Sequence, residues 1–173
     1  MLALWRVPDL YPLDRKILVP LDHPMLSTIQ RLVISKYTYP ISAAAEECPV
    51  FQMLSSAKNL QTLVLNDCAN LPFILALDPE RHPSKLVLCP TMEKLVLYIR
   101  IHENFHFDDL TSMAKNRASR GAKLSSIMMV SPRRHTPGGV SELMEHVTHL
   151  ERRRGKPRPA WGGDLDESGG ENE

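Results

Sequence analysis

Two histidines four residues apart form the clearest chemical motif in the sequence. The stretch His102-Glu-Asn-Phe-His106 matches the pattern H-E-x-x-H. On a helix, histidines at i and i+4 share one face and can hold zinc, while the glutamate activates a water molecule. Here the motif follows an apolar run over residues 95–101 that predicts a strand, and it precedes Asp108, a predicted helix N-cap. We therefore expect His102 and His106 to lie in a solvent-accessible loop without zinc, and this context disfavours the alternative, a zinc hydrolase through His102-Glu103-x-x-His106.

Other catalytic signatures are missing from the sequence. It contains no glycine-rich phosphate loop and no G-x-S-x-G nucleophile elbow. Three cysteines, Cys48, Cys68 and Cys89, are too widely spaced for a C-x-x-C metal site and are odd in number for a disulfide framework. We interpret Cys68 and Cys89 as buried packing residues of a protein in a reducing compartment. The sequence predicts no enzyme activity and no cofactor.

Composition limits the class of partner. The 173 residues are 43% hydrophobic and 24% charged, which is typical of one globular domain. A formal net charge of +1 and an aromatic content of 6% do not indicate a nucleic-acid partner. No apolar run approaches the roughly 18 residues that span a bilayer, and the N-terminus lacks the features of a signal peptide. We expect a cytoplasmic or nuclear protein without membrane contact.

An apolar pattern recurs along the chain at a nearly constant interval. Four seven-residue segments have apolar residues at their second, fifth and seventh positions: 28–34, 59–65, 91–97 and 123–129. From Ile29 the second position recurs after 31, 32 and 32 residues, and a weaker copy follows at 146–152. This is the L-x-x-L-x-L core of a leucine-rich repeat, and Cys68 occupies the position that such repeats fill with asparagine or cysteine. The spacing predicts adjacent parallel strands in sequence order; the alternative is four unrelated strands with a common alternation.

Helices are expected between these strands, because parallel strands need crossover connections. The clearest covers 107–121, with an apolar face (Leu110, Met113, Ala114 and Ala118), basic residues toward its end (Lys115, Arg117 and Arg120) and Gly121 as the stop. Shorter helices are predicted over 71–77, which ends before Pro79, over 43–57, which Pro49 interrupts, and over 141–146.

The predicted fold is α/β, a short leucine-rich-repeat-like solenoid with parallel strands and intervening helices. Residues 1–27 are expected to be an irregular N-terminal segment and residues 28–152 the repeat domain. From residue 153 the chain becomes first basic and then acidic and glycine-rich, so we expect a disordered C-terminal tail over 153–173.

Several stretches resemble the C-terminal repeat region of basidiomycete fungal F-box proteins. They are Leu71 to Pro90, Glu93 to Ile99, Met113 to Ile127, His146 to Leu150 and Arg158 to Trp161. The resemblance covers about residues 16 to 161, and Ala118 to Ser125 is its most specific part. It implies a protein-binding module, the substrate-recognition region of a Skp–cullin–F-box ubiquitin ligase receptor.

One part of that family pattern is not found in this sequence. The residues before Thr28 contain Pro8, Pro12, Pro20 and Pro24, and they are too few and too proline-rich for the helical F-box that docks on the Skp adaptor. We expect this chain alone not to bind Skp, which would be a partner only if an F-box exists upstream. The alternative is a structural or vestigial repeat fragment without a ligase role.

The expected binding surface is the face of the sheet that points away from the core. Alternation places the residues between the core leucines on that face. The middle positions are apolar in every repeat, and together with two neighbours they form the predicted partner-binding set for an unknown protein substrate: Val33, Val64, Lys94, Val96, Tyr98 and Met128. The alternative is that the strands are buried on both faces, in which case this apolar row is covered by the chain itself.

Overall fold

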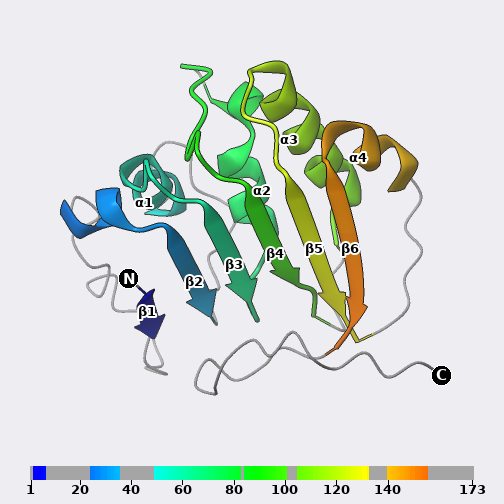
Figure 1. Ribbon diagram of the computed structural model, residues 1–173, viewed down its shortest axis with the longest axis horizontal. Coiled ribbons are helices and arrows are strands. Elements are labelled where there is room, and N and C mark those ends of the chain that lie inside the picture. The colour runs from blue at the N-terminus through cyan, green and yellow to red at the C-terminus, as the bar shows by residue number, and fades with distance from the viewer. Residues whose placement is uncertain are drawn as a thin grey trace.

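Six short strands form one parallel sheet in the computed structural model, which describes residues 2–6, 24–35, 49–82, 84–100, 105–132 and 140–155. The strands are β1 (Leu2–Arg6), β2 (Arg31–Ser35), β3 (Thr62–Asn66), β4 (Lys94–Tyr98), β5 (Ser126–Ser131) and β6 (His149–Arg154). Each strand pairs in parallel with the next one along the chain, so the order in the sheet is the order in the sequence (Figure 1). The predicted adjacency and direction of the four apolar segments are confirmed by β2 to β5.

Each of these strands begins three residues after the start of its seven-residue segment. The first three positions of each segment lie in a turn before the strand, and a backbone carbonyl of this turn bonds to the next unit. The carbonyl of Gln30 accepts from the N–H groups of Gln61 and Thr62, and the carbonyl of Gln61 accepts from those of Glu93 and Lys94. The second, apolar position of each segment is nevertheless buried, at Ile29, Leu60, Met92 and Leu124. The pattern therefore marks a turn together with the strand that follows it.

Four helices accompany the sheet, at α1 (Pro49–Ser56), α2 (Leu71–Leu77), α3 (Phe107–Ser119) and α4 (Val140–His146). Two 3-10 helices, η1 (Pro24–Thr28) and η3 (Pro79–Arg81), complete the described elements. Helix α2 ends at Leu77 because Asp78, which precedes a proline, takes an extended conformation with ψ 109°. All four predicted helices are confirmed in position, although residues 43–48 of the first lie outside the described part of the chain.

The helices lie along one side of the sheet, each packed against the next in sequence (Figure 1). Between the two layers lies the core, in which paired positions of successive strands form rows of buried side chains. One row is Leu32, Leu63, Leu95 and Ile127, and the next is Ile34, Leu65, Leu97 and Met129. These rows pack with helix residues such as Leu54, Phe73, Leu110 and Leu143. The opposite side of the sheet, called the open face below, carries no helix in the described ranges.

The ends of the chain differ from the expectation in two places. Leu2–Arg6 form β1 and pair with β2, so the segment 1–27 is not irregular throughout. At the other end, Arg153 and Arg154 belong to β6 rather than to a tail. Residues 156–173 lie outside the described part of the chain.

Candidate partner-binding surface

The strand register brings the predicted partner-binding residues together on the open face. Val33, Val64, Val96 and Met128 are paired across β2 to β5 and form one continuous apolar row. Lys94 and Tyr98 flank Val96 on β4, two residues before and two residues after it. Register alone therefore assembles all six residues, from four strands, on one face.

Exposure is uneven along this row. Val64 and Val96 keep only 8% and 7% of their surface exposed, whereas Val33, Lys94, Tyr98 and Met128 are half-buried. The two central valines nevertheless lie outside the core cluster between sheet and helices. The binding hypothesis required Val64 and Val96 to be exposed, and their burial contradicts that part of the expectation. A partner could reach the four half-buried residues, and a binding role stays a prediction for these four alone.

Two cations, Arg31 and Lys94, and a histidine border the apolar row on one side. Arg31, Lys94 and His149 share the row of paired positions that precedes it, together with Thr62 and Ser126. Glu151 is the only acid among the open-face strand residues of β2 to β6, and it forms an ion pair with Arg153 two residues later. The open face is thus apolar along its middle, has two cations along one border and has no unpaired acid at the open-face positions of β2 to β6.

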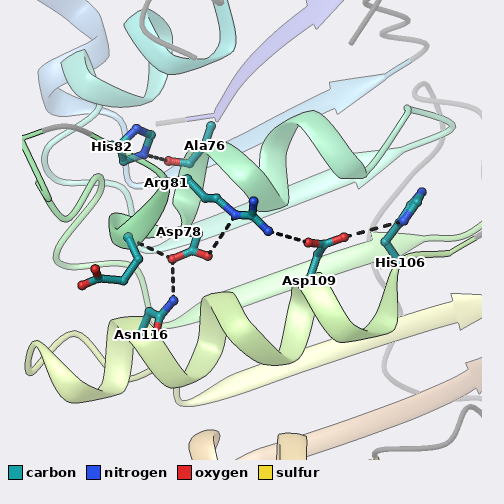
Figure 2. A network of polar contacts seen from close by, with 8 residues as sticks. Ala76, Asp78, Arg81, His82, His106, Asp109 and Asn116 are labelled. Atoms are coloured by element: carbon teal, nitrogen blue, oxygen red, sulfur yellow. Dashed lines mark hydrogen bonds and ion pairs between the residues drawn. The ribbon is translucent and has the colours of Figure 1, made fainter. Parts of the chain in front are cut away.

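A network of polar side chains lies on the helix side of the molecule (Figure 2). The buried carboxylate of Asp78 accepts from the backbone N–H of Glu80 at 3.0 Å and from Nδ2 of Asn116 at 2.9 Å. Arg81 extends the network, because its guanidinium lies 3.9 Å from Asp78 and 3.1 Å from Asp109. These contacts connect η3 to α3, which belong to neighbouring strand–helix units.

His106, the second histidine of the H-E-x-x-H motif, lies at the outer end of this network. Its side chain is 48% exposed, and Nδ1 is 3.6 Å from Oδ2 of Asp109 (Figure 2). It is the N-cap residue of α3 and, like Phe105, is not helical, so the last two residues of the motif are not on a helix. The expectation that Asp108 is the N-cap is wrong, because α3 begins at Phe107 and Asp108 lies in its first turn. His102 and Glu103 lie outside the described residues. Where the chain is described, no three His, Cys, Asp or Glu residues gather closely enough to hold a metal ion.

A buried arginine stands close to one of the cysteines. Arg117 of α3 is fully buried, and its two terminal nitrogens donate to the carbonyl oxygens of Leu88 at 2.7 Å and Cys89 at 2.9 Å. The Cys89 thiol donates to the carbonyl of Leu54 at 3.3 Å, and Cys68 donates to that of Ile34 at 3.2 Å. The burial expected for both cysteines is confirmed. Arg117, one of the basic residues expected toward the end of this helix, is in its last turn and is buried, because the loop before β4 lies over this position of α3.

Burial also determines the acidity of Cys89. Desolvation raises the pKa of its thiol from 9.0 to about 12, although the nearby Arg117 guanidinium acts in the opposite direction. In the unfolded chain the thiol ionises near pH 9, whereas in the folded chain it stays protonated to about pH 12. The free energy of unfolding therefore falls progressively as pH rises between these two values. We expect ionisation of Cys89 in the unfolded chain to lower the free energy of unfolding by about 1 kcal/mol between pH 9 and pH 10.

Chemical denaturation at both pH values measures this loss, and Cys89→Ala is the reference because it keeps all other ionising groups. The natural protein should lose more stability than the variant between the two pH values. Iodoacetamide at pH 8 should leave Cys68 and Cys89 unmodified in the folded chain. Rapid labelling of Cys89, or equal pH dependence of the two proteins, would show that the thiol is not held as described.

Comparison with known proteins assigns no family to this chain. No protein-family model matches it, nor does any curated protein or solved structure. Among the described residues, no helix has the length and apolar character required to cross a membrane.

Proposed function

We propose that the chain is a protein-interaction module, the substrate-recognition repeat region of an F-box-type ubiquitin ligase receptor. The observation that carries the proposal is the succession of strand and helix at intervals of about 32 residues from β2 to β5, with the four described α-helices on one side of the sheet. In such an arrangement each unit contacts mainly its neighbours and leaves one long face of the sheet for a partner. This is the basis for treating the sheet as a leucine-rich-repeat-like solenoid.

Hydrogen bonds at one-repeat separation support the same interpretation. Nδ2 of Asn59 donates to the carbonyl of Ser27, 32 residues away, and Oγ1 of Thr91 donates to that of Lys58, 33 residues away. Cys68 bonds to the carbonyl of Ile34 at a separation of 34. A side chain at the asparagine-or-cysteine position that satisfies a backbone carbonyl of the preceding unit is what a leucine-rich repeat requires there.

An experiment with matched variants tests the proposal. The full chain is used as bait for cell extract, beside Lys94→Glu combined with Tyr98→Glu on the open face and Lys115→Glu on α3 as a control. Proteins captured by the natural chain and the control, but lost from the open-face variant, are the candidate substrates. When an F-box is fused to the N-terminus of the natural chain, these proteins should be ubiquitylated and their half-lives shortened. Capture of the same set by all three baits would contradict the proposal.

A further inference from the structure

We infer that the open face binds an acidic segment of another protein that also carries apolar side chains. This inference rests on the proposed function and adds the chemistry of the partner. Its starting point is the asymmetry of charge around the apolar row. Arg31 and Lys94 are half-buried beside that row, and within the described part of the chain neither forms an ion pair. The one strand acid on this face, Glu151, is already paired with Arg153.

Arg31 has a second feature that favours an anionic partner. Its Nε–H is shielded from solvent and donates to no atom in the described residues. A shielded donor without an acceptor is costly, and the cost is removed when the side chain turns so that an incoming oxygen accepts from it. A carboxylate is the oxygen acceptor that a guanidinium binds most strongly in proteins, through charge-assisted hydrogen bonds.

The spacing of the two cations sets the dimensions of the partner. Arg31 and Lys94 occupy the same row but lie two strands apart, on β2 and β4, which corresponds to about 10 Å across the sheet. Carboxylates seven residues apart on a helix are separated by a similar rise, about 10.5 Å. A segment lying across the strands can thus place acids against the two cations and apolar side chains against Val33, Met128 and Tyr98.

A nucleic acid fits the same face less well. The row beside the cations is made of valine and methionine, and Tyr98 is the only aromatic residue on this face of β2 to β6 that could stack on a base. Phosphate contacts alone would leave the half-buried apolar side chains without partners, and single-stranded nucleic acids need several stacking platforms. An acidic, partly apolar peptide satisfies both features at once.

The test uses a phage-displayed library of random peptides selected on the full natural chain. Peptides selected on it should be enriched in Asp and Glu together with Leu, Ile, Phe or Trp. Their affinity should fall roughly tenfold or more for Arg31→Glu combined with Lys94→Glu, because each carboxylate then faces a like charge. Lys115→Glu, a charge reversal at one residue on the helix side, should bind as the natural chain does. Circular dichroism and thermal unfolding confirm that each variant is folded.

Several outcomes would overturn the inference. Selection of neutral or basic peptides, equal affinity for the double variant, or failure to select any peptide would each do so. A random 20-nucleotide RNA that binds more tightly than the peptides, with the same dependence on Arg31 and Lys94, would identify a nucleic acid as the occupant. If acidic peptides are selected only after the acids of the last ten residues are neutralised (Asp164, Asp166, Glu167, Glu171 and Glu173), the face is filled by the chain itself. None of these results depends on the extract experiment, so the proposed function is judged separately.

Discussion

Replacing Arg117 with methionine should lower the free energy of unfolding by about 3 kcal/mol. The guanidinium is fully buried and donates to the carbonyls of Leu88 and Cys89 from the last turn of α3. Methionine fills much of the same space but leaves both carbonyls without this donor, and each buried group left unsatisfied costs roughly 1–3 kcal/mol. Part of the loss is offset, because the variant no longer buries a cation without a carboxylate partner. The cost of the two unsatisfied carbonyl groups is the larger effect, because the loop before β4 cannot turn both groups toward water without separating from α3.

Urea denaturation of the full chain measures this effect, and Lys115→Met is the matched control. Lys115 lies on the same helix and is exposed, so its replacement should change stability by less than about 0.5 kcal/mol. Amide exchange should also become faster around Leu88 and Cys89 in the Arg117 variant, and Cys89 should become reactive toward iodoacetamide. An Arg117→Met protein as stable as the natural chain would show that the arginine does not fasten this loop.

Replacing Leu95 with alanine should cost about 3–4 kcal/mol. Leu95 lies at the centre of the sheet, paired with Leu63 on one side and Ile127 on the other, and no part of it is exposed. Truncation removes apolar contacts and leaves a cavity that the neighbouring strands cannot close, because Leu63 and Ile127 are themselves packed in the same row. Each strand packs mainly on the next, so the substitution weakens the contact of β4 with both neighbours.

Leu86→Ala is the control for this prediction, since it makes the same chemical change at a residue that is 53% exposed. Its effect on the midpoint of denaturation should be small. A loss below about 1 kcal/mol for Leu95→Ala would mean that the central row is not packed as the structure describes. An equal loss of stability for both variants would mean that Leu86 is buried in solution and not exposed as the structure describes.

The candidate surface was only partly predictable. Alternation along each strand correctly placed Val33, Val64, Val96 and Met128 in one row on the face away from the core, because successive side chains of a strand point to opposite sides. The sequence could not give their exposure, which depends on the flanking and neighbouring side chains. The sequence analysis also did not predict the cationic border, because Arg31 and Lys94 are 63 residues apart and only the pairing of β2, β3 and β4 aligns them.

The sequence by itself determined the elements and their order. An apolar position repeated at intervals of 31 and 32 residues is a local signal written once in each unit, and it placed four strands and the helices between them. Tertiary structure alone decided the hydrogen-bond partners of Arg117. Helical periodicity places Arg117 on the same face as Leu110 and Met113, so its burial follows from the local pattern. Its hydrogen-bond partners do not, because they are backbone carbonyls of a loop 28 and 29 residues earlier in the chain. The physical reason is the separation along the chain of the groups that interact. The direction of a side chain follows from its local backbone, whereas its hydrogen-bond partners belong to segments about one repeat away in the sequence.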